Sequence, residues 1–166
     1  MSDWMITDSR VGLQAIDDLD TTKNHALGTI IKAESPTYGA GEFIYLLGVV
    51  NTVAGSPVTW DALTHQTVLA PVGSNLPSAV AFAMGACVAA TYGWYQISGK
   101  VLASKAATIC CVAGAAVGVK TTGLISKTGS GKELEGAICA ATGSAKTGVI
   151  TVLLAISRPR YQGRIT

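Results

Sequence analysis

Apolar residues alternate with small or polar residues along much of this chain, and the alternation gives the first indication of its structure. Between residues 79 and 84, Val, Phe and Met take every second position and Ala takes the others, which is the period of a β-strand. A second alternating run follows at residues 92–97, and Gly93 favours a turn or bulge between the two runs. We therefore predict two strands at residues 79–101, forming the apolar centre of a β module.

The same region raises the question of a membrane span, because residues 62–99 contain no Asp, Glu, Lys or Arg. A spanning helix needs about 20 predominantly apolar residues, and Leu, Ile, Phe and Val supply most of the favourable transfer energy. The most apolar part, residues 79–97, contains more Ala than those four residue types together, and it carries two glycines. We predict strands here and expect no membrane partner.

Other short runs rich in branched and aromatic residues are separated by Gly, Pro, Ser and Asn at intervals of roughly ten residues, a spacing typical of sandwiches and barrels. The further predicted strands are 28–33, 42–50, 58–60, 67–72, 100–103, 108–112 and 149–156. The pattern predicts an all-β fold, a compact β-barrel or jelly-roll-like sandwich. Because Ala favours helix, residues 103–116 and 133–145 leave a short helix open in each.

The polarity of the chain divides it into three regions. Residues 1–26 are the most polar and predict an extended N-terminal arm, residues 27–157 form the β domain, and residues 158–166 form a basic C-terminal tail. Trp4 is a large apolar residue within the polar arm. Two interpretations stay open for this arm: a disordered tail, or a segment that docks on a neighbouring molecule through Trp4.

Charge is sparse and unevenly distributed. Only 13% of the residues are charged, whereas 49% are apolar. Residues 1–60 carry a net charge of −4 and residues 61–166 a net charge of +6. The bases are scattered singly, which is poor for tracking a phosphate backbone, so no nucleic-acid partner is expected. Low charge with a high apolar content favours a protein packed against other copies or another protein. The charge asymmetry fits such a contact, or folding simply mixes the charges over one surface.

The residues that could carry chemistry form no recognisable motif. None of the four cysteines is in a CxxC pair, and neither His25 nor His65 has HxxxH or HExxH spacing. We therefore expect no metal, no cofactor and no catalytic residues, and we interpret the cysteines as reduced core residues. A catalytic pair that meets only in space stays open.

Residues 128–133 resemble part of a nucleotide-binding P-loop. That motif requires Gly, then any four residues, then Gly-Lys-Ser/Thr, so that backbone amides surround the phosphates. Here Ser126 stands at the first position and Glu133 follows Lys132. The segment therefore predicts a hairpin tip and no nucleotide site.

Three blocks of sequence point to a family. Residues 28–33 with 36–46, residues 92–100 and residues 155–159 resemble the capsid decoration, or cement, proteins of tailed bacteriophages. The resemblance implies a non-enzymatic β module on the outside of the assembled shell. It would bridge neighbouring capsomers, with the major capsid protein and its own copies, as dimer or trimer, for partners. Assembly would take place in the host cytoplasm and the protein would reside on the capsid surface of the virion.

Aromatic and basic residues are the expected contacts with the capsid or between subunits. The candidates are Trp4, Tyr38, Phe43, Trp94, Tyr95, Arg158, Arg160 and Arg164. Aromatic and arginine side chains often dominate binding energy, although aromatics on strands more often belong to the core. The alternative functions are another virion subunit, in the tail or a fibre, and a small ligand- or glycan-binding β module.

Overall fold

The computed structural model describes residues 3–8, 12–87, 90–106, 111–143 and 150–163, and in these the protein is all-β with antiparallel strand pairing. The strands are β1 (Met5–Ile6), β2 (Leu19–Asp20), β3 (Ile30–Ser35), β4 (Gly39–Leu47), β5 (Pro57–Trp60), β6 (Thr67–Leu69), β7 (Ala81–Ala83), β8 (Tyr92–Ser104), β9 (Ala116–Thr121), β10 (Leu124–Lys127), β11 (Glu133–Cys139) and β12 (Thr151–Tyr161). No helix in this described part is long and apolar enough to cross a membrane.

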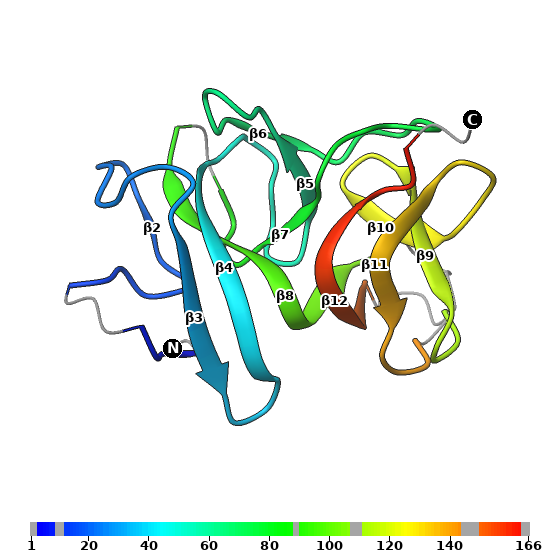
Figure 1. The fold of residues 1–166 in the computed structure, drawn as a ribbon, viewed down its shortest axis with the longest axis horizontal. Coiled ribbons are helices and arrows are strands. Elements are labelled where there is room, and N and C mark those ends of the chain that lie inside the picture. The colour runs from blue at the N-terminus through cyan, green and yellow to red at the C-terminus, as the bar shows by residue number, and fades with distance from the viewer. Residues whose placement is uncertain (1–2, 9–11, 88–89, 107–110, 144–149, 164–166) are drawn as a thin grey trace.

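The long strand β8 runs through the middle of the molecule and joins two half-sheets (Figure 1). Its first half pairs with β4, and its second half pairs with β12. We call β1, β3, β4 and the start of β8 the N-terminal half-sheet. The end of β8, with β12, β11, β9 and β10 in that order, forms the C-terminal half-sheet.

β8 changes partners at Gly99, and only glycine fits there. Its φ is +102°, and a Cβ on this residue would lie 2.4 Å from the carbonyl oxygen of Ala40. Glycine adopts positive φ readily and lets two backbones approach closely. The bend therefore depends on this residue, which links the sequence directly to the two-part architecture.

Where β4 pairs with the start of β8, both faces of the N-terminal half-sheet are covered. On one face, Trp94 packs with Ile16 and other residues of the N-terminal segment. On the other face, Tyr95 packs with Val58 and Ala81 of the small β5–β6–β7 layer. This arrangement explains why consecutive residues of β8 are buried and why the surrounding sequence carries no charge.

The C-terminal half-sheet curls around the largest core cluster of the described residues. Its members are apolar side chains from β8, β9, β10, β11 and β12, with Phe82 of β7 among them. An isolated parallel bridge between Lys105 and Ile125 brings β10 beside the end of β8, but the sheet is not closed. The predicted all-β class is confirmed, in an open, sandwich-like form.

Several predictions about elements are confirmed and others are wrong. The strands predicted around 79–101 are β7 and β8, which pair directly, with Phe82 opposite Gln96. Gly93 lies inside β8 rather than in a turn, because Leu19 of β2 packs over its bare Cα. The helices left open at 103–116 and 133–145 do not form in the described residues: residues 111–115 lie in neither helix nor strand, and Glu133–Cys139 form β11.

Three further segments differ from the sequence-based picture. Residues 128–133 connect β10 to β11, which lie on opposite sides of β9, so the segment is not a hairpin tip. In the predicted strand 108–112, only residues 111 and 112 are described, and they are not in a strand. β12 continues through Arg158 and Arg160 to the buried Tyr161, so the first part of the predicted tail belongs to the sheet.

The predicted N-terminal arm lies along its own chain. β1 pairs with β3, β2 pairs with β8, and Ile16 is almost completely buried. In its described part, the arm is therefore an extended cover over one face of the N-terminal half-sheet.

Candidate interaction surface

Three of the predicted contact residues lie in the core. Phe43, Trp94 and Tyr95 are at most 1% exposed. Trp94 donates a hydrogen bond from its indole nitrogen to the carbonyl of Gln14 at 3.0 Å. Burial removes the Tyr95 phenol from water, and this raises its pKa above the usual value. These three residues stabilise the fold and are not surface contacts in this conformation.

Trp4 and Tyr38 are half-buried and lie together at the surface. Their rings stack with centroids 6.0 Å apart, and the Trp4 ring meets the buried Phe43 edge-on at 5.0 Å. They line an open groove of about 260 Å³, which we call the aromatic groove. Met84, Lys100 and Leu102 also line it.

Asp3 fixes the N-terminal segment beside this groove. Its carboxylate accepts a hydrogen bond from the Ser35 hydroxyl at 2.9 Å, at the end of β3. Hydrogen bonds from the side chains of Thr37 and Ser35 lower the pKa of Asp3 below its usual value. An ionised Asp3 therefore holds Trp4 over the β3–β4 turn at neutral pH.

A row of apolar side chains, two exposed and two half-buried, crosses the outer face of the C-terminal half-sheet. Leu102 on β8 is directly opposite Leu153 on β12, and Ala155 is directly opposite Ile138 on β11. Leu102 is 46% exposed and Ile138 48% exposed. We call these four residues the apolar strip. Because Leu102 also lines the aromatic groove, the groove and the strip form one continuous surface.

The sequence did not single out the apolar strip. Within β12, both alternating sets of residues are apolar, and this indicated a strand buried on both faces. The structure covers only the face carrying Val152, Leu154 and Ile156. The available signal was the apolar character of the alternate positions, Leu153 and Ala155, whose face the described residues leave partly exposed.

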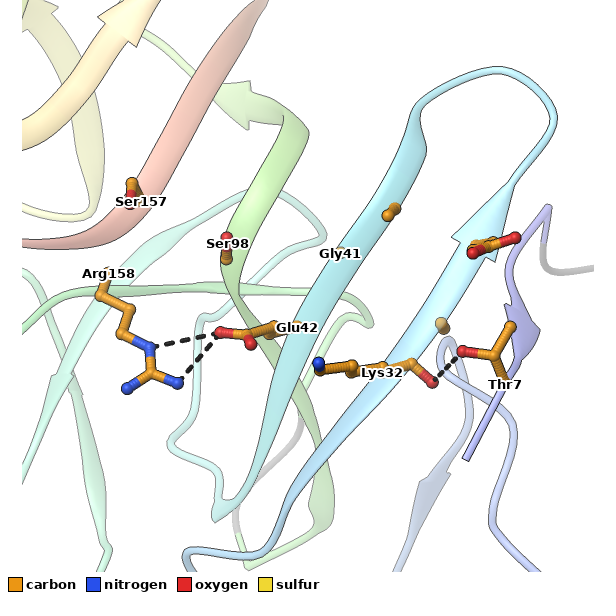
Figure 2. A pocket seen from close by; sticks show the side chains of 10 residues that line it. Thr7, Lys32, Gly41, Glu42, Ser98, Ser157 and Arg158 are labelled. Carbon is orange, nitrogen blue, oxygen red and sulfur yellow. Dashed lines mark hydrogen bonds and ion pairs between the residues drawn. The ribbon is translucent and has the colours of Figure 1, made fainter. Parts of the chain in front are cut away.

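Arg158 lies in a polar groove of about 330 Å³ (Figure 2). This groove is on the side of the β4–β8 junction away from the aromatic groove. Its guanidinium donates from two nitrogens to one carboxylate oxygen of Glu42, at 3.1 and 3.2 Å. The pair joins β12 to β4 across the bend of β8. Lys32 lines the same groove, and its carbonyl accepts a hydrogen bond from the Thr7 hydroxyl at 3.3 Å.

Arg160 is exposed and forms its own ion pair. Its Nε lies 2.8 Å from a carboxylate oxygen of Glu135 on the neighbouring strand β11. Arg158 and Arg160 are thus surface residues, as a contact role requires, while each is already paired with an acid of its own chain. Arg164 lies outside the described residues.

The two histidines lie in different surroundings within the described part of the chain. The His25 ring packs against Tyr45 and Trp94, and its Nε2 accepts a hydrogen bond from the backbone of Gln14 at 3.2 Å. His65 lies in a turn with a φ of +55°. No group of three or more His, Cys, Asp and Glu side chains is placed to hold a metal in these residues.

The cysteines within the described ranges, Cys87, Cys111 and Cys139, are all buried. The Cys87 sulfur lies 2.7 Å from the Thr91 hydroxyl. The aromatic groove and the apolar strip form one largely apolar, partly exposed surface on the described part of the chain.

Comparison with known proteins adds nothing to this geometry: no family model, curated protein or solved structure matches the chain.

Proposed function

We propose that this chain is a structural virion protein that binds the outside of an assembled phage capsid and stabilises it by bridging neighbouring capsomers. The observation that carries the proposal is the apolar strip, continuous with the aromatic groove, on a chain with few charges. A contiguous exposed apolar surface marks a site of protein contact more often than scattered apolar residues do. The resemblance of residues 28–33 with 36–46, 92–100 and 155–159 to decoration proteins supplies the kind of partner.

The chain would stabilise the shell because its binding is coupled to shell assembly. A protein that binds the assembled shell, and not its separate parts, stabilises the shell by mass action. Residues of the apolar strip would lose their remaining exposure in such a contact, and burial contributes roughly 25 cal/mol per Å² of apolar area. The major capsid protein would supply the opposing surface, on the capsid exterior of the virion. No enzymatic step is part of this proposal.

Shells lacking this protein provide the test. Adding the purified chain is expected to raise the temperature at which the shells disrupt and to bring the chain into the shell pellet on sedimentation. Leu102→Asp and Ile138→Asp each place a charge in the apolar strip and are expected to weaken shell binding by about tenfold or more.

Leu63→Asp is the matched control. Leu63 is 91% exposed and lies outside the strip, so the same change of chemistry is expected to leave shell binding unchanged. Absence of co-sedimentation, or equal loss with all three variants, would contradict the proposal.

The two alternative functions have distinct signatures. A tail or fibre subunit would be located on the tail by electron microscopy of virions. A small-ligand module would need a formed pocket, and such pockets usually occupy about 300–1,000 Å³ with most of the ligand covered. The apolar pocket beside Trp60 and Ile30, the aromatic groove and the polar groove at Arg158 measure about 200, 260 and 330 Å³, which is below or at the lower end of that range.

A further inference from the structure

The polar groove at Arg158 contains a row of four polar side chains, one from each of four neighbouring strands (Figure 2). Lys32 on β3 is directly opposite Glu42 on β4. Ser98 on β8 is directly opposite Glu42 on one side and Ser157 of β12 on the other. Residues directly opposite each other in antiparallel strands point to the same face of the sheet. Because neighbouring strands lie about 4.8 Å apart, this polar row extends over roughly 14 Å of the face.

Most hydrogen-bonding groups of the polar row are not used by the chain itself. Within the described residues, neither the Lys32 ammonium nor the hydroxyl of Ser98 or Ser157 has a hydrogen-bond or ion-pair partner. Arg158 donates only to Oε2 of Glu42, so Oε1 of this half-buried carboxylate is also without a partner in the described part of the chain. The groove therefore presents both donors and acceptors to a ligand.

An apolar pocket adjoins the polar groove. It is the pocket of about 200 Å³ beside Trp60 and Ile30, which we call the Trp60 pocket. Arg158 lines both hollows, and Ile30 lies two residues before Lys32 on the same face of β3. Trp60 is half-buried, and its indole nitrogen has no hydrogen-bond partner among the described residues. The polar row and the Trp60 pocket therefore form one continuous surface with a polar and an apolar part.

The backbone of Arg158 gives a second, independent indication of a site. Its φ of +44° lies in the left-handed region, which a residue with a side chain rarely adopts. Strained conformations of this kind persist where the surrounding structure holds them, and they cluster at binding and active sites. Here the strained residue lines both the polar groove and the Trp60 pocket.

We propose that the polar groove and the Trp60 pocket together bind a neutral oligosaccharide. The charges of the lining cancel, with Lys32 and Arg158 against Glu34 and Glu42, so the groove favours neither an anion nor a cation. A hydroxyl group both donates and accepts hydrogen bonds, so the hydroxyls of a sugar match free donors and free acceptors alike. The C–H face of a sugar ring is apolar and suits the side chain of Trp60.

The topology disfavours an extended peptide as the occupant. Peptides that extend a sheet bind to an unpaired strand edge. β4 and β8 carry the middle of the polar row, and within the described residues each is paired on both sides there. A saccharide needs only the side chains that the row presents. This inference goes beyond the proposed function, since it concerns a ligand of the free chain and not the shell.

Titration of the full chain with sugars, in the absence of shells, tests the site. The probes are maltotriose and cellotriose, two neutral trisaccharides, and amide NMR spectra follow the Trp60 indole N–H and the backbone of the polar row. At least one probe is expected to cause saturable shifts at these positions. The expected dissociation constant is on the order of 1 mM, because exposed hydrogen bonds contribute little net free energy.

Two ion pairs of the same strand provide the variants and their controls. Arg158→Ala and Glu42→Gln each disrupt the pair inside the groove and are expected to weaken sugar binding by about tenfold or more. Arg160→Ala and Glu135→Gln disrupt the neighbouring pair, which lines neither the polar groove nor the Trp60 pocket. These matched controls are expected to leave the dissociation constant unchanged.

The absence of saturable shifts with both trisaccharides would overturn the inference, and so would equal weakening in the two ion pairs. A response to sodium phosphate or to tetraglycine, and not to the sugars, would identify an anion or a peptide as the occupant and would also overturn it. Melting temperatures identify any variant that fails to fold. Ser157→Ala, at an exposed hydroxyl, then carries the comparison and is expected to weaken binding about threefold.

Shell co-sedimentation separates this inference from the proposed function. Wild-type chains that bind sugar but not shells contradict only the capsid role. Wild-type chains that bind shells but neither trisaccharide contradict only the oligosaccharide site.

Discussion

Arg158 reaches Glu42 because its backbone leaves the ordinary strand conformation. Its φ is +44°, in the left-handed region, and the register of the β11–β12 pair shifts beside it, between Glu135 and Ala137. A left-handed conformation costs a residue with a side chain roughly 1–2 kcal/mol. The ion pair it makes is partly exposed, and such pairs contribute about 0–1 kcal/mol. Arg158 is therefore placed at a cost that the ion pair alone does not offset.

Two substitutions at this position separate the backbone from the side chain. Arg158→Ala and Arg158→Gly both remove the ion pair with Glu42, but only glycine relieves the left-handed strain. We expect the Gly variant to be more stable than the Ala variant by about 1 kcal/mol. Urea unfolding midpoints of the two proteins give the difference. Equal midpoints would mean that the backbone at this residue is unstrained.

At the same scale, the sequence could not say which aromatic side chains are buried. Alternation places Trp94 and Tyr95 on opposite faces of a strand, and it normally leaves one face exposed. Here the N-terminal segment covers one face and the β5–β6–β7 layer covers the other. Covers formed by residues distant in sequence leave no local signal. Trp4 and Tyr38, by contrast, were identifiable as isolated apolar residues in polar surroundings.

Among the elements, β8 carries the architecture, since it belongs to both half-sheets. The bend at Gly99 lets it leave β4 and join β12. A strand of this length without a bend would extend one flat sheet. The orientation of the apolar strip relative to the aromatic groove therefore depends on this one position.

We expect Gly99→Ala to be strongly destabilising. The added Cβ would lie 2.4 Å from a backbone oxygen, and the positive φ adds strain. Gly39→Ala is the control, because Gly39 has a φ of +78° with nothing within 4 Å of an added Cβ. The control is expected to lose about 1 kcal/mol and the Gly99 variant at least about 3 kcal/mol, measured by urea unfolding. Similar losses would mean that the close contact at Gly99 relaxes freely.

Element prediction succeeded where the period was clear and failed where composition misled. β7 and β8 followed from alternation within residues 79–101. The segment 133–145 carries several alanines, which favour helix, but its first part pairs with β12 and β9 as β11. Pairing over long sequence distances overrides such intrinsic propensity. The predicted end of β12 came too early, because Arg158 and Arg160 resemble a charged tail in the sequence. In the structure these two side chains face outward at the edge of the core, while Pro159 and Tyr161 are buried.

Across the whole molecule, stability is expected to fall at both extremes of pH. Hydrogen bonds lower the pKa of Asp3, Asp20 and Asp61 in the fold, so their contribution is present at neutral pH and is lost as pH falls below about 4. Burial raises the pKa of Tyr95 and Tyr161 above the ordinary 10.0. The unfolded chain then releases these protons first, and stability decreases as pH rises above about 10.

Melting temperature against pH measures both effects. Tyr161→Phe removes one buried phenol and is expected to flatten the alkaline decrease, although it also loses the hydrogen bond of 2.7 Å to the Pro71 carbonyl at every pH. An alkaline slope identical to that of the wild-type protein would show that Tyr161 does not release its proton on unfolding.

The distribution of charge could be read from the sequence only in part. The acidic first third and basic remainder were visible, with mixing over one surface as the open alternative. The structure pairs Glu42 with Arg158 and Glu135 with Arg160, and each pair joins residues that are distant in the sequence. Distance in space, and not order in sequence, decides which charges stay unmatched.

The place of β12 in the sheet also sets the timing of folding during translation. β12 lies between β8 and β11, although it is made after both. Until β12 leaves the ribosome, the edges of β8 and β11 that pair with it have no partner strand. The core side chains of the C-terminal half-sheet are then uncovered on that side. At 5–20 residues per second, the roughly 20 residues from the end of β11 to the end of β12 take about 1–4 s to synthesise. During that interval the nascent chain exposes unpaired strands that other chains can capture, so high expression favours aggregation before the protein is complete.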